Sequence, residues 1–185
     1  AYKQCIDAGA MTCMIGHIMQ PAYSRHFNPA IQDCDILPAT LDYDLVTKLL
    51  QEQLGFQGLV VTDATTMAGM AIAMPRSRAV PQSIAAGCDM FLFCRNLKED
   101  YGYMKAGVED GTITEARLEE AVKQTLALKA ALQLPEKREQ GRLTPTLAEV
   151  KQSLGSPEHL HWAKQCTQKS AVPYTHPTLL PNYSA

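Results

Sequence analysis

A short apolar run at residues 59–61 (LVV) places the strongest constraint on the fold of this chain. The run follows Gly58 and leads through one threonine to Asp63. Because it has β-branched members and no polar alternation, it is typical of a strand buried on both faces, as in a parallel sheet. In parallel sheets and barrels, ligands and catalytic groups lie where strands end. Asp63 is therefore a candidate catalytic carboxylate, although an Asp at this place can also cap the segment that follows.

Two further apolar runs predict strands at residues 11–18 and 89–93. Apolar residues at three- and four-residue spacings predict helices between and after the runs, near residues 42–54, 64–78, 82–86, 97–108, 114–134, 147–154 and 157–169. Strands that alternate with helices indicate βαβ units, so the predicted fold class is α/β with a parallel sheet.

Capping and breaking residues set the predicted helix ends. Asp42, Asn96 and Thr114 are placed to cap three of the helices, and Pro75 breaks the helix predicted over 64–78. The prolines within residues 21–36 predict an irregular loop, and the charged residues 136–141 predict an exposed linker. Three prolines within 173–182 predict little regular structure there.

Length and composition limit the classes of protein to consider. The chain has 185 residues, fewer than the about 250 of a complete (β/α)8 barrel, and it begins at Ala1, as a piece of a longer protein would. With 46% hydrophobic and 19% charged residues it is globular. A net charge of −2 without a basic run gives no case for nucleic acid or a membrane as partner. No signal-peptide pattern is visible, so we expect a cytoplasmic location.

The cysteines and glycines give no sign of a metal or a cofactor. Six cysteines occur without a C-x-x-C pair, which disfavours a zinc or thioredoxin-like motif. Cys13, Cys88 and Cys94 lie in or beside apolar runs and are predicted to be buried free thiols in a reducing compartment. Neither a G-x-G-x-x-G fingerprint nor a phosphate-binding P-loop is present.

Residues 55–64 (GFQGLVVTDA), with Met67 beyond them, resemble the nucleophile strand of glycoside hydrolase family 3. The Thr-Asp-Ala-x-x-Met form is closer to the β-N-acetylhexosaminidase branch than to the β-glucosidase branch, which usually has Trp after the Asp. Three more stretches follow the family in order: 14–17 (MIGH), 38–41 (PATL) and 86–90 (AGCDM). A helix over 114–134 resembles the one that closes the family's barrel domain.

This resemblance implies that the chain is the last part of a (β/α)8 TIM barrel. Residues 1–134 would hold the last βα units, and residues 135–185 a linker with the start of a second domain or an irregular tail. Asp63 would be the nucleophile of a retaining β-N-acetylhexosaminidase that acts on a small carbohydrate through a covalent glycosyl-enzyme. His17 and Met67 would contact the substrate, with plain core roles as the alternative for both.

Other features set this chain apart from a complete enzyme. The branch carries its acid/base histidine in a Lys-His-Phe-Pro-Gly-His pattern, and this sequence has no such pattern. A non-catalytic α/β fragment, or a sugar-binding or interaction domain, is therefore the alternative function, and we expect the isolated chain to be inactive.

An aspartyl-phosphate phosphatase is disfavoured because Thr65 stands where such sites carry a second Asp. Open barrel edges predict self-association, which a sharp monomer peak in light scattering would contradict.

Overall fold

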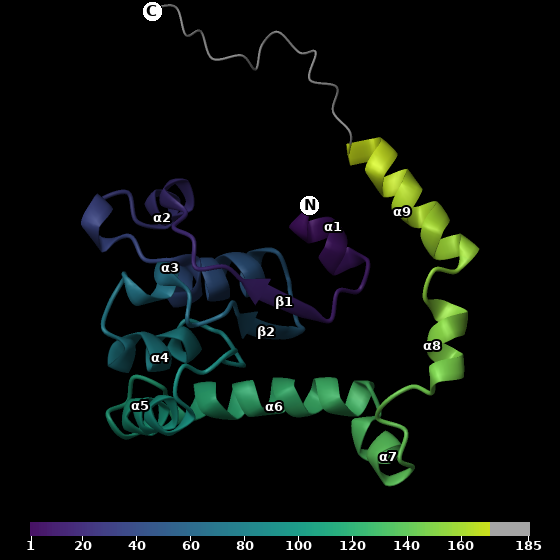
Figure 1. Ribbon diagram of the computed structural model, residues 1–185. Coiled ribbons are helices and arrows are strands. Elements are labelled where there is room, and N and C mark those ends of the chain that lie inside the picture. The colour runs from purple at the N-terminus through teal and green to yellow at the C-terminus, as the bar shows by residue number, and fades with distance from the viewer. Residues whose placement is uncertain (171–185) are drawn as a thin grey trace, which may run out of the picture. The chain divides into compact units, whose positions relative to one another are not determined.

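A computed structural model describes residues 1–170 of the chain (Figure 1). The chain divides after Pro135 into two compact units. Irregular structure predicted over 173–182 falls outside the described residues. The assignment of residues 1–134 to barrel units and of 135–185 to a linker and second domain stays a prediction.

The first unit contains a parallel sheet, as the apolar runs predicted. Strand β1 (Thr12–Ile15) pairs with β2 (Leu59–Thr62), with Thr12 opposite Leu59 and Ile15 opposite Thr62. Every residue of β2 is buried, which agrees with its lack of polar alternation. The third run joins the sheet through a single parallel bridge between Val61 and Met90.

The prediction of a full strand over 89–93 is therefore wrong in its extent. Two side chains take the positions of backbone partners: the Asp89 carboxylate accepts the Val60 N–H (2.9 Å), and the Thr62 hydroxyl accepts the Leu92 N–H (3.0 Å). At Phe93 the backbone turns to a φ of 54°, outside the extended region. A continuous backbone ladder cannot form where side chains replace its partners.

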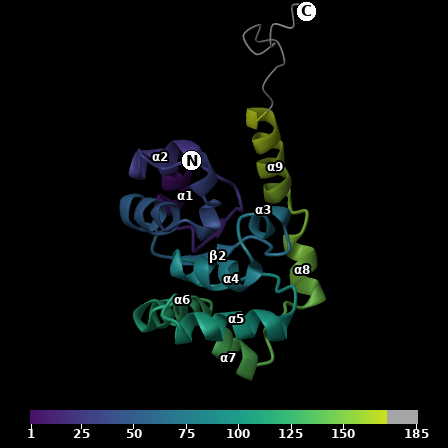
Figure 2. The same ribbon diagram turned by 90° about the vertical axis from the view of Figure 1, so that its left-hand side faces the viewer.

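Helices surround this small sheet (Figures 1 and 2). In the first unit they are α1 (Tyr2–Asp7), α2 (Pro21–Phe27), α3 (Ala68–Ala71), α4 (Arg76–Ala85), α5 (Leu97–Glu109) and α6 (Glu115–Ala131), with the short 3-10 turns η1 (Asp33–Asp35) and η2 (Ala39–Leu41) and the π-helix η3 (Asp44–Gln53). Helix α7 (Leu134–Glu139) spans the division in the sequence, and α8 (Leu147–Ser153) and α9 (Pro157–Ser170) belong to the second unit.

Two predicted caps are present, and the third, Asp42, lies one residue before the N-cap of its helix, Tyr43. The Asn96 side chain accepts from the backbone N–H groups of Lys98 and Glu99, and the Thr114 hydroxyl accepts from that of Arg117. The Asp42 carboxylate accepts the Asp44 N–H at 2.9 Å, at the start of η3.

Other predicted boundaries are wrong. Helix α2 lies within the predicted loop, because Pro21 can begin a helix where no N–H is needed. Helix α4 starts directly after Pro75 and includes Pro81, instead of beginning at residue 82. The predicted linker at 136–141 is exposed as expected but is largely helical in α7.

The segment predicted as an α-helix over 42–54 is a π-helix for most of its length. The Leu54 N–H donates to the Leu49 carbonyl, five residues back, at 2.9 Å. Two side chains on this helix, Thr47 and Gln51, donate to the carbonyls of Ala86 and Gly87 (2.9 and 3.2 Å). These bonds join η3 to the turn after α4.

The core of the first unit has two parts. One part packs η3 against the sheet, through Val46, Leu50, Phe56, Val60 and Cys88. The other lies between η2, α3 and α4, through Leu41, Met70 and Ala79. The first part includes Val60 of β2, so the strand is packed against apolar side chains up to the point where Asp63 follows it.

The cysteine predictions are confirmed only in part. All six thiols are free, and Cys88 is buried. Cys13 is half-buried, and Cys94 is exposed because the chain turns away from the sheet at Phe93. None of the helices within residues 1–170 has both the length and the apolar character that crossing a membrane requires.

Candidate active site

Asp63 is the first residue after β2, at the carboxyl end of the parallel pair. Its N–H donates to the Ile15 carbonyl at 3.0 Å, which continues the sheet by one hydrogen bond. The carboxylate is half-buried, and its Oδ1 accepts the Ala64 N–H at 2.7 Å. Helix α3 begins only at Ala68, with Met67 at its N-cap. Asp63 therefore does not cap a helix, and its second carboxylate oxygen has no hydrogen-bond partner within residues 1–170.

His17 lies in the interior beneath this turn, with only 7% of its surface exposed. Its Nδ1 is 2.9 Å from the Thr40 hydroxyl, and its Nε2 is 3.2 Å from the Ala64 carbonyl oxygen. The Ala64 carbonyl can only accept, so Nε2 carries a proton and donates to it. The Thr40 hydroxyl, which pairs with Nδ1, also donates toward the carbonyls of residues 15 and 16 (3.1 and 3.0 Å). The structure thus places His17 in contact with the residue that follows Asp63, and both of its ring nitrogens have protein partners.

Met67 lies at the far end of the same turn. Its N–H donates to the Ala64 carbonyl at 3.0 Å, and its side chain is 46% exposed. The first turn of α3 passes close to β1: a Cβ on Gly69 would come within 3.0 Å of the His17 backbone. Only a glycine allows this approach, so the turn from Asp63 to Gly69 is packed tightly against the end of β1.

Thr65 fixes the turn on its other side. It is completely buried, its hydroxyl donates to the Phe93 carbonyl at 2.7 Å, and its N–H donates to the Leu92 carbonyl at 3.3 Å. Its own carbonyl accepts from Arg76 Nη1 at 2.8 Å. Three consecutive residues from Asp63 to Thr65 are thus held by contacts with three different parts of the chain.

The sequence analysis missed Arg76 and its partner, Asp100. Arg76 Nε and Nη2 donate to the two carboxylate oxygens of Asp100, each at 2.7 Å. Burial acts to raise the pKa of Asp100, but the hydrogen bonds and charge of Arg76 and the N–H groups of Arg95 and Asn96 outweigh it, and the pKa lies below its ordinary value. No signal in the sequence indicated this pair, because the helix predicted over 64–78 places Arg76 in its last turn, where a cation is favourable.

A second buried carboxylate, Asp89, lies away from Asp63 and joins α6 to the end of α4. Its Oδ1 accepts from Arg117, which also donates to the carbonyls of Ile84 (3.0 Å) and Cys88 (2.9 Å). Burial raises the pKa of Asp89, although the N–H of Val60 and Arg117 oppose the shift. Because both of its carboxylate oxygens have partners within the protein, Asp89 has a structural role.

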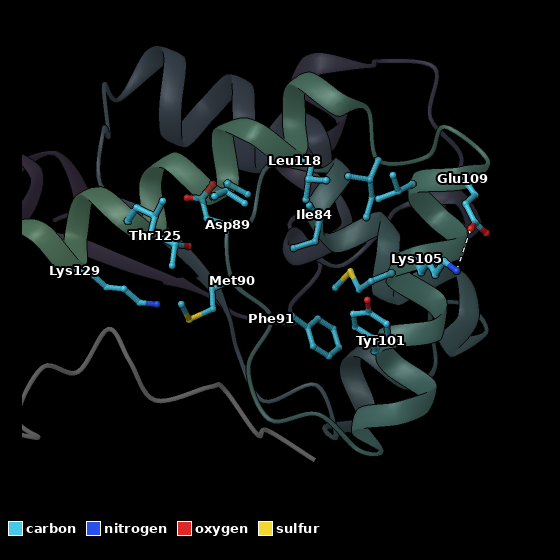
Figure 3. A pocket seen from close by; sticks show the side chains of 16 residues that line it. Ile84, Asp89, Met90, Phe91, Tyr101, Lys105, Glu109, Leu118, Thr125 and Lys129 are labelled. Carbon is cyan, nitrogen blue, oxygen red and sulfur yellow. Dashed lines mark ion pairs between the residues drawn. The ribbon is translucent and has the colours of Figure 1, made fainter. Parts of the chain in front are cut away.

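A cavity of about 800 Å3 in the first unit does not contain Asp63. It is a groove between α5 and α6, and its side chains are mostly apolar, with a Lys105–Glu109 ion pair of 3.5 Å at one end (Figure 3). Leu118 and Tyr101 line it and are 40% and 70% exposed. It is an uncovered helix surface without convergent polar groups, so it does not have the character of a catalytic site. Self-association through such surfaces stays a prediction.

Within residues 1–170, no three His, Cys, Asp or Glu side chains lie close enough together to hold a metal ion. The chemistry available at the end of β2 is therefore that of one partly open carboxylate on a rigid turn. Such a group can act as a nucleophile toward an electrophilic carbon or as a base.

Comparison with known proteins gives the class to which this site belongs. Residues 1–128 match the family described as the glycosyl hydrolase family 3 N terminal domain. The chain belongs to glycoside hydrolase family 3, as its motifs indicated.

Curated relatives lie within the branch that the Thr-Asp-Ala-x-x-Met form indicated. The chain is 59% identical over 133 residues to a β-N-acetylglucosaminidase/β-glucosidase of Cellulomonas fimi, covering 72% of this chain and 24% of that protein. It is 32% identical over 154 residues to β-hexosaminidase A of Pseudoalteromonas piscicida, covering 79% of this chain and 25% of that protein. The chain thus spans about a quarter of the length of these relatives.

Solved structures support the same family. A β-glucoside phosphorylase, BglX, bound to 2FGlc is 38% identical and has a TM-score of 0.79, covering 98% of this chain and 32% of that one. A glycoside hydrolase family 3 β-N-acetylglucosaminidase from Paenibacillus is 30% identical with a TM-score of 0.60, covering 70% of this chain and 23% of that one.

Proposed function

We propose that this chain supplies the catalytic nucleophile, Asp63, of a retaining β-N-acetylhexosaminidase that removes terminal N-acetyl-hexosamine residues. The observation that carries the proposal is the half-buried Asp63 carboxylate at the end of β2, on a turn whose next two residues are held by buried side chains. The relatives named β-hexosaminidase and β-N-acetylglucosaminidase support the choice of sugar.

The proposed reaction proceeds in two steps. The ionised Asp63 carboxylate attacks the anomeric carbon while the glycosidic oxygen leaves, and a covalent glycosyl-enzyme forms. Water then attacks the same carbon, releases the sugar and restores the carboxylate. The leaving oxygen must receive a proton, and no residue of this chain matches the family's acid/base pattern. We place that group on a loop elsewhere in the whole protein, within the rest of a (β/α)8 barrel.

The other two predicted site residues take different parts in this proposal. Met67, with its exposed side chain next to the turn, contacts the sugar. His17 does not contact the sugar, because its Nε2 faces the Ala64 carbonyl and its ring has little exposed surface. It affects the substrate through the position of the turn.

Phosphorolysis, in place of hydrolysis, is an alternative for the step that releases the sugar from Asp63. The β-glucoside phosphorylase matches this chain over a greater share and with a higher TM-score than the Paenibacillus β-N-acetylglucosaminidase. In that reaction a phosphate oxygen replaces water: the bond between Asp63 and the anomeric carbon breaks, and the product is a sugar 1-phosphate. The first step and the role of Asp63 are the same for both acceptors.

The test replaces Asp63 by Ala in the whole protein and measures turnover of an aryl N-acetyl-β-glucosaminide, with and without inorganic phosphate. We expect a loss of roughly 10³-fold or more, because no other group can form the covalent intermediate. Asp35→Ala, which removes an exposed carboxylate from η1, is the matched control and should keep full activity. Free sugar as product supports hydrolysis, and sugar 1-phosphate supports phosphorolysis.

Mass spectrometry of the wild-type protein, quenched during turnover, should find the sugar attached to the peptide that contains Asp63. If Asp63→Ala keeps most of its activity, the nucleophile assignment is wrong. A non-catalytic α/β or sugar-binding role for this chain would then be the better explanation.

A further inference from the structure

All the nitrogen atoms of the Arg76 side chain are engaged within the protein. Two of them form the paired contact with the Asp100 carboxylate, Nη1 donates to the Thr65 carbonyl at 2.8 Å, and Nη2 also reaches the Thr65 hydroxyl at 3.2 Å. The guanidinium lies 5.6 Å from the centre of the Phe91 ring. Arg76 is therefore not free to bind a substrate anion, and whatever it does passes through these partners.

The Arg76–Asp100 pair itself is well buried. The side chains are 18% and 3% exposed, and the Arg95 N–H adds a further hydrogen bond to Asp100 Oδ2 at 3.0 Å. Taking two charges out of water is costly, so such a pair is weak evidence for stability alone. Its geometry instead fixes where the third donor of the guanidinium points, because the planar group has a rigid fork of N–H bonds.

That third donor points at the turn that carries Asp63. Thr65 follows Asp63 by two residues, and its carbonyl is buried and accepts from Arg76. On the other side of the turn, His17 contacts the Ala64 carbonyl. The backbone on the carboxyl side of Asp63 therefore cannot rotate unless one of these two contacts breaks.

We propose that Arg76, held in place by Asp100, is a positioning residue that fixes the turn at residues 63–67 and thereby aims the Asp63 carboxylate at the reacting carbon. The proposal rests on the proposed role of Asp63 as nucleophile. A misplacement of about 1 Å in a reacting group can cost roughly 10²-fold in rate, so a side chain that never touches the substrate can control the chemical step.

The experiment replaces Arg76 by Lys in the whole protein. Lysine keeps the positive charge but lacks the planar guanidinium with its several N–H donors. It therefore cannot bind both oxygens of Asp100 and the Thr65 carbonyl together. We expect kcat for the aryl N-acetyl-β-glucosaminide to fall roughly 10- to 100-fold with KM changed less than about threefold. Arg78→Lys is the matched control, because Arg78 lies on the same helix and is exposed. It should leave both constants unchanged.

Rates are expressed per competent site, counted from the burst of aryl product when the first sugar is bound. This normalisation separates positioning from stability, because a variant that merely unfolds loses sites but keeps the rate per site. Asp100→Asn is the second variant, and it should lower kcat per site in the same direction. It keeps the test decisive if Arg76→Lys yields no folded protein.

Two outcomes are distinguishable. If Asp63→Ala is inactive while Arg76→Lys and Asp100→Asn turn over like the wild type per site, the positioning role is wrong and the nucleophile stands. If Asp63→Ala is active, the proposed function itself fails, whatever the Arg76 variants do.

Discussion

Two glycines on α5 predict opposite effects for the same substitution. Gly107 is buried where α5 crosses α4, and a Cβ there would lie within 3.0 Å of the Pro81 Cβ and 3.2 Å from its Cγ. Gly102 lies on the same helix, is exposed, and has no atom near the place of its missing Cβ. Gly107→Ala therefore tests the close packing of α4 and α5, and Gly102→Ala is its matched control.

The size of each effect follows from packing and helix propensity. Optimal carbon–carbon contacts are about 3.5–4.0 Å, so α5 must shift to admit a methyl group against a proline ring, which has no other rotamer to adopt. Overpacking of this kind costs about 1–3 kcal/mol, and we take the upper end because the obstacle is rigid. Alanine recovers about 1 kcal/mol of helix propensity at either position. We expect Gly107→Ala to destabilise by about 2 kcal/mol, and Gly102→Ala to stabilise by about 1 kcal/mol.

Urea unfolding followed by far-ultraviolet circular dichroism measures both effects. For a chain of this size, 1 kcal/mol corresponds to a shift of roughly 2–4 °C in Tm, so thermal melts should separate the variants clearly. The m-values should stay equal, because neither change alters the surface exposed on unfolding. If Gly107→Ala is as stable as the wild type, α5 does not pack on Pro81 as described. A loss of stability for Gly102→Ala would refute the propensity argument.

Two further predictions concern thiols and acid. A thiol reagent should label the four exposed cysteines quickly. Cys88 should react only after unfolding, because its thiol is buried and burial raises its pKa. Rapid labelling of Cys88 in the native protein would contradict the core described. The pKa of Asp100 is lowered in the folded state, so its contribution to stability is present above the unfolded pKa of about 3.9 and is lost as the pH falls through the folded value. The difference in unfolding free energy between wild type and Asp100→Asn should therefore be largest near neutral pH and shrink below about pH 4. An equal difference at pH 7 and pH 3 would show that the carboxylate charge is not the cause.

The parts of the fold that the sequence predicted correctly are those governed by local patterns. The run before Asp63 is a buried strand, because an apolar run with β-branched residues leaves few alternatives. Asn96 and Thr114 cap their helices because their side chains bond N–H groups two or three residues away. These contacts form between residues that are close in the sequence, so a single sequence is enough to predict them.

The parts that could not be predicted depend on partners far along the chain. No local pattern shows that Arg76 meets Asp100, or that the Asp89 carboxylate takes the place of a backbone acceptor in the third run. The family resemblance implied a substrate contact for His17, with a core role as the alternative, but its ring nitrogens face Thr40 and Ala64, which no spacing rule indicates. Asp63 was found because its position after a strand is local, while the contacts that hold it are not.

The contacts around Asp63 also have a consequence for the order of folding. His17 and Ala64 are 47 residues apart in the chain, and Arg76 and Asp100 are 24 apart. Closing loops of this length costs chain entropy, and contacts between distant residues slow folding. The turn that carries the nucleophile therefore reaches its final geometry only when β1, α4 and α5 have all assembled around it. Hydrogen exchange at the Thr65 amide consequently reports on the assembly of the whole first unit, not on fraying of a single loop.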